Sequence, residues 1–393
     1  MNQFNFYANK PSQNYHKVDM WFLLSVLLLW GLGIFTLLAC TKNHFANNSF
    51  SYVKRQFFSS IIGFVFFFCF MFIDIKKIRK MVGIIVIVSF VFCLLTFIKP
   101  ISIERNGARR WLKMPGNFTF QPSELAKFAV VLFLANFFDK QERLENPEEK
   151  NVLLSVIVLC LFVGVVILQK DMSTSIFILA VGILMFFVTG QKLLWLIPFL
   201  IFVIPMTVIS MFLEKYRINR ILGWLHPEQF NTTINFQSNA AKTAISAGGF
   251  WGSGIGSGLV KINSIPENQA DYIFAGWAEA MGFVGVLAYF AVLIFFAWRG
   301  YKNSLNCSDR FSAYSSFGCV SIIFMQSIVN TMVVCGLLPS TGIPLPFFSL
   351  GGSSIIVTLA MCGFILNASR SEESVEILSE NDEISLENLS YLS

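Results

Sequence analysis

Long apolar runs separated by short polar segments dominate the chain. A run of roughly 17 to 25 such residues crosses about 30 Å of hydrocarbon as a helix. The pattern predicts ten runs of this kind, near residues 20–41, 57–73, 82–98, 123–138, 152–168, 175–189, 193–212, 274–298, 315–335 and 349–368. We therefore expect an all-α, polytopic membrane protein of about ten transmembrane helices, and an even number of crossings places both termini on one side.

The composition supports this class, since 55% of the residues are hydrophobic and only 13% are charged, which lies outside the usual range of soluble domains. The first apolar run lacks an Ala-x-Ala cleavage pattern and is expected to be an uncleaved anchor. The 8 cysteines and 3 histidines are scattered without the spacing of a disulfide framework or a zinc site. We expect no nucleic-acid partner.

The orientation follows from a basic cluster. Lys76, Lys77, Arg79 and Lys80 are predicted to lie in the short loop after the second helix, which the positive-inside rule places in the cytoplasm. Both termini are then cytoplasmic. Residues 1–19 form a cytoplasmic N-terminal segment, residues 20–369 a single membrane domain, and residues 370–393 an acidic cytoplasmic tail of the composition that is typical of disorder.

The predicted outer loops contain as many basic residues as the predicted cytoplasmic segments. This parity works against the positive-inside preference and favours binding of an anion, either a lipid headgroup or a substrate, at the outer face. Ordinary solvated loop charge is the alternative.

Two arginines and a tryptophan, Arg109, Arg110 and Trp111, lie in the second predicted outer loop. Guanidinium groups offer planar bidentate donors to phosphate oxygens, and a tryptophan can stack on a sugar. The segment therefore predicts a binding site for a diphosphate and a sugar. Anchoring at the membrane interface is the alternative for Trp111.

The fourth predicted helix begins with a charged pair. Pro122 suits the first helical position, with Gln121 as the cap and Glu124 in the first turn, where a carboxylate complements the helix dipole. Lys127 lies three residues further on and can pair with Glu124. Capping and pairing are structural alternatives, but charge inside a transmembrane helix is by default a hypothesis of function, so both residues are candidates for substrate binding.

The short connection between the fifth and sixth helices contains Lys170, Asp171 and Ser173. Asp171 and Ser173 can cap the incoming helix, whereas Lys170 and Asp171 together can contact a headgroup or a metal ion. Lys170 and Asp171 are therefore candidate substrate-binding residues, with capping as the alternative.

The longest polar segment is the predicted outer loop 213–273, between the seventh and eighth helices. Its interleaved aromatic and aliphatic residues favour amphipathic pieces on the membrane over disorder. The glycine-dense stretch 248–258 lets the backbone approach a ligand or another helix closely. Lys261 and Glu267 in this loop are further candidate substrate-binding residues.

Asp271 stands at the boundary between this polar loop and the apolar eighth helix. An ionisable group at such a boundary is costly to keep without a function, and a carboxylate shielded from water can accept a proton near neutral pH. Asp271 is therefore the candidate catalytic base. Capping of the eighth helix is the structural alternative.

The last predicted outer segment, residues 338–354, contains three prolines and paired glycines. Such helix-breaking residues are tolerated at membrane depth only where the backbone packs within protein or lines a polar cavity. We expect a re-entrant element beside the site, with Ser349 and Ser353 as candidate substrate-binding residues.

The chain resembles the SEDS family of shape, elongation, division and sporulation proteins at five segments, residues 106–112, 121–127, 169–174, 252–274 and 338–354. Their order and spacing match the family over nearly the whole membrane region. The chain departs from it at Gln269-Ala270, where His-Thr is frequent, and at Leu350, where Tyr is frequent. The double arginine at 109–110 leans toward the division member, FtsW, rather than the elongation member, RodA.

The resemblance implies a bacterial peptidoglycan glycosyltransferase that polymerises lipid II at the outer face of the cytoplasmic membrane. It also implies a class B penicillin-binding protein and other division proteins as partners at the septum. The essential aspartate of the family falls on Asp271, its Arg-Trp loop on residues 109–111, and its embedded charged pair on Glu124 and Lys127.

An inverting displacement would then use Asp271 as the base, while the two arginines and Lys127 neutralise the departing diphosphate. The family further implies a divalent cation, Mg²⁺ or Mn²⁺, for which no ligand set can be read from the sequence.

Three alternatives stay open. A transporter that flips lipid II also has intramembrane charge and broken segments, although no inverted repeat is visible and the polar residues concentrate on the outer face. A non-catalytic division scaffold would use Asp271 only as a cap, and an elongation polymerase would share the chemistry. Replacing Asp271 by asparagine separates a cap from a base, because asparagine caps well but cannot act as a general base.

Overall fold

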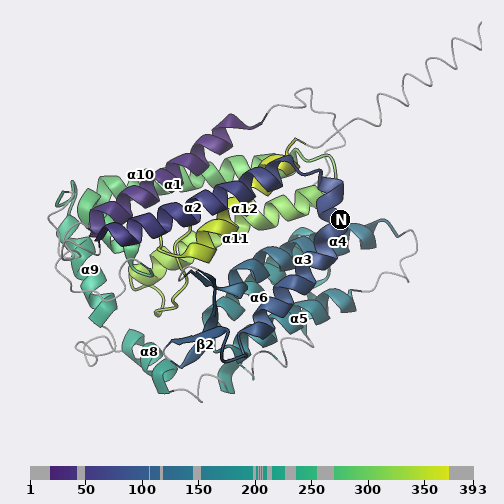
Figure 1. The fold of residues 1–393 in the computed structure, drawn as a ribbon, viewed down its shortest axis with the longest axis horizontal. Helices are drawn as coiled ribbons and strands as arrows, with labels where there is room; N and C mark the ends of the chain where they lie inside the picture. The colour runs from purple at the N-terminus through teal and green to yellow at the C-terminus, as the bar shows by residue number, and fades with distance from the viewer. Residues whose placement is uncertain are drawn as a thin grey trace, which may run out of the picture.

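The computed structural model describes residues 18–41, 49–105, 107–115, 118–144, 152–197, 215–225, 236–254 and 270–370, together with part of 201–209. Most of these residues are helical, which confirms the all-α class. The helices are α1 (Met20–Thr41), α2 (Ser49–Phe72), α3 (Ile75–Leu95), α4 (Pro122–Glu142), α5 (Leu153–Leu168), α6 (Met172–Val188), the 3-10 helix η3 (Leu193–Leu196), α8 (Lys215–Leu225), α9 (Phe236–Gly248), α10 (Ile273–Leu305), α11 (Arg310–Val334) and α12 (Gly352–Ala368). Figure 1 shows most of the long helices running side by side.

Five helices in the described part of the chain are long and apolar enough to cross a membrane, namely α1, α2, α3, α10 and α11. The apolar helices α5, α6 and α12 are shorter, and α4 is long but contains charged residues. The predicted seventh span begins as η3 and continues through residues that the structure describes only in part. The count of about ten spans therefore stays a prediction.

Bulky apolar side chains cover the outward faces of α2 and α3. Phe58, Phe68, Ile84 and Ile87 are each more than half exposed. A soluble protein rarely exposes contiguous apolar surface of this kind, whereas lipid tails are as apolar as these side chains. The surface of both helices is therefore that of a membrane protein.

The turn between α2 and α3 is shorter than the sequence pattern predicts. Asp74 caps α3 by accepting a hydrogen bond from the backbone N–H of Lys76 at 2.8 Å, and a capping aspartate lets a helix begin at once. The predicted loop of basic residues is therefore wrong, since all four lie in the first turns of α3: Lys76, Lys77, Arg79 and Lys80. Their cytoplasmic placement stays a prediction.

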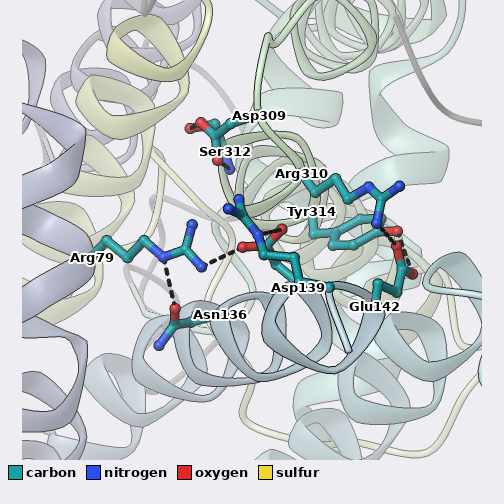
Figure 2. Close-up of polar contacts among 9 residues, drawn as sticks. Arg79, Asn136, Asp139, Glu142, Asp309, Arg310, Ser312 and Tyr314 are labelled. Atoms are coloured by element: carbon teal, nitrogen blue, oxygen red, sulfur yellow. Dashed lines mark hydrogen bonds and ion pairs between the residues drawn. The ribbon is translucent and has the colours of Figure 1, made fainter. Parts of the chain in front are cut away.

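Charged side chains join three helices at the end of α4 remote from the sheet. Arg79 of α3 forms an ion pair with the buried carboxylate of Asp139 on α4. One turn further along α4, Glu142 accepts contacts at 2.9 Å from both Arg310 and Tyr314 of α11. Figure 2 shows these side chains converging on the C-terminal turn of α4. The network fixes this end of α4 between α3 and α11.

Helix α4 lies inside the bundle. It packs against α3, α6, α11 and α12, and Phe128, Val131 and Leu134 in its middle are buried. The neighbouring helices α2 and α12 pack closely at Gly363. A Cβ atom added there would lie only 2.1 Å from the carbonyl oxygen of Phe67. Small residues allow transmembrane helices to pack at such short range.

A small antiparallel sheet precedes α4, where the sequence predicts only a loop. Its strands are β1 (Ser102–Arg105), β2 (Ala108–Lys113) and β3 (Thr119–Phe120), in the order β1-β2-β3. Glu104 pairs with Arg109 and Leu112 pairs with Phe120. In Figure 1 the sheet, α8 and α9 lie toward the same side of the helices.

Helix α10 is broken at Gly282, whose φ of 64° and ψ of −163° are not helical. The turn at residues 249–254 inserts at the break. The N–H groups of Ser253 and Gly254 donate to the carbonyls of Glu279 and Ala280 at 2.9 and 3.2 Å. These bonds satisfy backbone groups that the break releases, as burial in a membrane protein requires.

The described part of the long outer loop contains helices and a close glycine contact, while its placement on the membrane stays a prediction. Helices α8 and α9 are the expected ordered pieces, and the glycines allow a close approach to another helix, since a Cβ on Gly252 would lie 2.3 Å from the carbonyl oxygen of Ala280. Lys261 and Glu267 lie outside the described residues, as do the segments 1–17 and 371–393.

Candidate active site

A cavity of about 380 Å³ lies between the first half of α6, α8, α11 and the loop 338–343. Its walls are largely apolar, with residues such as Ile176, Phe177 and Val329. Three cationic residues also line it, Arg110 from β2, Lys170 from the turn before α6, and Arg220 from α8. An apolar pocket with a few convergent charges is the usual form of a ligand site, and these charges favour an anionic ligand.

Arg110 lines the cavity and Arg109 does not. The pairing of β2 with β1 shifts between Ile103 and Glu104, which leaves Arg110 as the extra residue of a bulge next to Arg109. Arg109 instead binds Glu104 across the hairpin, with its Nε and Nη2 atoms 3.0 and 2.9 Å from Glu104 Oε2. The structure therefore brings one arginine of the predicted pair to the cavity, not both.

Arg110 is held in place by the turn before α6. Its Nη1 lies 3.5 Å from Asp171 Oδ1, and its Nη2 donates to the carbonyl oxygen of Lys170. The Nε atom is buried without a hydrogen-bond partner in the described structure. Since a buried donor without a partner is unfavourable, the guanidinium group is incompletely satisfied on its Nε side.

Asp171 occupies the N-cap position of α6, but its side chain does not cap the helix. The carboxylate instead faces Arg110 and accepts a hydrogen bond from Gln121 Nε2 at 3.1 Å. Lys170, just before it, adopts a left-handed φ of 63°, which is uncommon for a residue other than glycine. Ser173, the other predicted cap, lines the cavity.

Glu124 and Lys127 form the predicted pair on α4. The carboxylate and the ammonium group are 2.9 Å apart, and both side chains are almost fully buried. Lys127 Nζ also donates to Gln326 Oε1 of α11 at 2.6 Å and lies 5.4 Å from the centre of the Phe177 ring. Since Phe177 lines the cavity, the ion pair lies directly behind its wall. Gln121, the predicted cap of α4, makes no capping hydrogen bond with its side chain.

Asp271 lies against the loop 338–343. A Cβ atom added to Gly342 would lie 3.4 Å from Asp271 Oδ2, and the neighbouring residues Thr341 and Ile343 line the cavity. The N-cap of α10 is Tyr272, so Asp271 precedes the capping position.

Tyr272 reports on the local electrostatics. Burial, with a smaller contribution from the nearby Asp271 carboxylate, raises the pKa of its hydroxyl to about 12 against a lowering effect of Arg220. The hydroxyl therefore stays protonated near neutral pH. Asp271 and Arg220 both act on the same group, which places the candidate base and a cavity cation in one electrostatic environment.

The remaining candidates do not line the cavity. Trp111 lies in β2 opposite Ile103 and is partly exposed. Ser349 Oγ accepts a hydrogen bond from the backbone N–H of Leu345 at 2.7 Å, and its carbonyl accepts one from Gln56 at 3.1 Å. Ser353 is buried in the first turn of α12. The contacts of Ser349 stabilise the loop before α12.

Three polar residues near the site were not among the sequence candidates. Arg220 lines the cavity and donates to the carbonyl oxygen of Ser340 at 3.0 Å. Gln326 and Asn330 bridge α11 to other segments. The sequence did contain a signal for Gln326 and Asn330. Both are polar residues within an apolar span, and they are four residues apart and hence on one helix face.

The described residues do not offer a site for a divalent cation. No three His, Cys, Asp or Glu side chains among them gather into a set that could hold a metal ion. Asp171, the nearest carboxylate to the cavity cations, is already bound to Arg110 and Gln121.

Comparison with known proteins identifies the family. Residues 18–374 match the family described as cell cycle protein, FtsW/RodA/SpoVE. The chain is 32% identical over 357 residues to a probable peptidoglycan glycosyltransferase FtsW of Geobacter sp. strain M18, covering 89% of this chain and 96% of the relative. It is also 32% identical over 359 residues to stage V sporulation protein E of Bacillus subtilis strain 168, covering 90% and 97%.

The fold has a counterpart among solved structures. A chain from the structure titled "Structural coordination of polymerization and crosslinking by a peptidoglycan synthase complex" aligns with a TM-score of 0.73 and 25% identity, over 92% of this chain and 100% of that one. The family match spans nearly the whole chain and confirms the resemblance of the five segments. The chain belongs to the SEDS family of membrane proteins, which includes FtsW, RodA and SpoVE.

Proposed function

We propose that this protein is a peptidoglycan glycosyltransferase that polymerises lipid II at the outer face of the cytoplasmic membrane. The observation that carries the proposal is the apolar cavity lined by Arg110, Lys170 and Arg220, with Asp271 behind the adjoining loop. A lipid-linked diphosphate combines an apolar chain with a compact anion, and the cavity offers complementary surfaces for both. The names of its relatives support the same activity.

The chemistry is a single displacement. Lipid II is linked to its diphosphate in the α configuration and the polymer is β-linked, so inversion at the anomeric carbon is the simplest route. The Asp271 carboxylate takes the proton from the 4-hydroxyl of the acceptor N-acetylglucosamine. The hydroxyl oxygen bonds to the anomeric carbon of the donor as the bond to the diphosphate breaks, and the electron pair leaves with undecaprenyl diphosphate.

The cavity cations stabilise the leaving group. Negative charge develops on the diphosphate as the bond breaks, and positioned cations in a site shielded from water stabilise it. Arg110 is the principal candidate, because it lines the cavity and Asp171 orients its guanidinium group. The Glu124–Lys127 pair places a further positive group behind the same wall.

We infer a role in division. FtsW proteins are among the relatives, and this supports septal wall synthesis with other division proteins. A peptidoglycan synthase complex is among the structural neighbours, which supports a class B penicillin-binding protein as the partner that crosslinks the strands. The basic residues in the first turns of α3 support cytoplasmic termini by the positive-inside rule.

The two arginines of β2 provide the test and its control. We expect Arg110→Ala to lower kcat/KM for polymerisation of purified lipid II by roughly 100-fold, the usual effect of losing one group that stabilises developing charge. Arg109→Ala, which removes an adjacent and more exposed arginine, should change kcat/KM by less than about threefold. Equal losses from both variants would contradict the assignment of the cavity as the diphosphate site.

A further inference from the structure

The buried polar side chains of α11 are of two kinds. Ser327 Oγ donates to the carbonyl of Ile323 at 2.8 Å, and Thr331 Oγ1 donates to that of Ser327 at 3.1 Å, so both bond within their own helix. Gln326 and Asn330 are equally buried but reach segments outside α11. Hydroxyls that bond back to their own helix are common in transmembrane helices, whereas a buried amide that leaves its helix makes a specific connection.

Asn330 connects the two segments that meet at the candidate base. Its Nδ2 donates to the carbonyl oxygen of Asp271 at 3.0 Å and to that of Ile343 at 2.8 Å. Both partners are carbonyl oxygens, which only accept, so the amide nitrogen must face them and the orientation of the side chain is unique. One amide therefore joins the turn before α10 to the loop that forms a wall of the cavity.

This connection restrains the Asp271 carboxylate from two sides. Fixing the carbonyl of Asp271 fixes the peptide from which its side chain extends. Fixing Ile343 also fixes the adjacent Gly342, near which Asp271 Oδ2 lies. Asn330 is 1% exposed and is not among the residues that line the cavity, so it does not contact a ligand held there.

A matching connection lies one turn earlier on α11. Gln326 accepts a hydrogen bond from Lys127 Nζ at 2.6 Å and donates to the carbonyl oxygen of Pro344 at 2.9 Å. The same face of α11 thus holds the loop at two successive residues, Ile343 and Pro344. The loop cannot shift past α11 without breaking both amide contacts.

We propose that Asn330 is a positioning residue that holds Asp271 and the loop 341–343 in register beside the cavity. The inference rests on the proposed function, in which Asp271 is the base. A base displaced by about 1 Å loses roughly 100-fold in rate, while substrate affinity is little changed because Asn330 makes no contact with the cavity. Loss of Asn330 should therefore lower kcat rather than raise KM.

The test compares Asn330→Ala, Asn330→His and Thr331→Val in the full-length protein with its cognate transpeptidase. We expect kcat for lipid II polymerisation to fall roughly 10- to 100-fold in Asn330→Ala with KM within about twofold of wild type. Asn330→His retains one ring N–H donor and should recover part of kcat, and it also serves if the alanine variant does not fold. Thr331→Val removes an equally buried hydroxyl that bonds within α11, and should leave both constants near wild type.

A second readout does not depend on activity. The Asp271 carboxyl is labelled with a water-soluble carbodiimide and an amine, and its labelling rate is followed by peptide mass spectrometry. A changed rate in the Asn330 variants, with no change in Thr331→Val, supports the positioning role. Unchanged kcat and unchanged labelling in Asn330→Ala overturn it. A wild-type protein that forms no polymer overturns the proposed function instead, and the labelling rates then still decide whether Asn330 positions Asp271.

Discussion

The buried Glu124–Lys127 pair allows stability and catalysis to be separated. Glu124→Gln removes the charge that balances Lys127 while keeping the size of the side chain. Besides the neutral amide introduced at position 124, Lys127 Nζ would retain two contacts, the Gln326 oxygen at 2.6 Å and the Phe177 ring at 5.4 Å. Breaking a buried ion pair from one side costs about 3 to 5 kcal/mol, and these two remaining contacts favour the lower end of that range.

The double variant Glu124→Gln/Lys127→Met removes both charges. Replacing a buried ion pair by neutral groups of similar volume is often close to neutral for stability. We therefore expect the double variant to recover to within about 1 kcal/mol of wild type, although each single variant is destabilised. The midpoint of thermal unfolding in detergent, followed at matched protein concentration, measures this recovery.

Activity should not recover with stability. If Lys127 contributes positive charge behind the cavity wall, the double variant folds normally but polymerises lipid II at least about tenfold more slowly than wild type, since one charged group in a shielded site is worth that much or more. A stable double variant with wild-type kcat would refute this role and leave the pair purely structural. Single variants as stable as wild type would refute the reasoning about burial.

Two further predictions concern α10 and a charged contact with its C-terminal half. Gly282→Ala should destabilise the protein by about 2 to 4 kcal/mol, because its φ is 64° and the added Cβ would lie 2.3 Å from Gly252 N. The control is Gly83→Ala in α3, where the added Cβ meets open space, and it should change stability by less than about 1 kcal/mol. The unfolding midpoints of the two variants are compared. Burial raises the pKa of Asp19, but hydrogen bonds from Arg299 and the Phe22 backbone outweigh it, so the pKa lies below its ordinary 3.8. The stabilisation from Asp19 is therefore present above pH 3.8 and is lost as the pH falls through the lower folded-state value. Unfolding midpoints across this range should lose that dependence in Asp19→Asn, and an unchanged pH profile would contradict it.

The apolar runs predicted most helices well because their boundaries are set locally. Residues 20–41 coincide with α1, and residues 152–168 differ from α5 by one residue. At both places polar residues end the run. The break in α10 was not predictable in this way, because Gly282 lies within a predicted span and is distorted by the distant turn at 249–254.

The charged candidates could be found from the sequence because charge in an apolar chain is costly. The sequence pattern did not predict which partners these side chains contact. Arg109 and Arg110 are adjacent in sequence, and only the strand β2, which was not predicted, sends them to different partners. Asn330 and Gln326 matter through contacts with carbonyl groups of distant loops. Such contacts depend on the packing of α11 against the loop 338–351, which no local sequence signal specifies.

The most direct test of the account is the formation of glycan strands from purified lipid II by wild type and by Asp271→Asn, with the cognate transpeptidase bound and with folding matched by unfolding midpoint. The account predicts polymer from wild type and a loss of at least about 100-fold in the variant, because asparagine keeps the size of the side chain but cannot accept the proton. Equal polymer from both proteins would remove Asp271 from the chemistry. Absence of polymer from wild type, with the partner confirmed bound, would contradict the glycosyltransferase function itself.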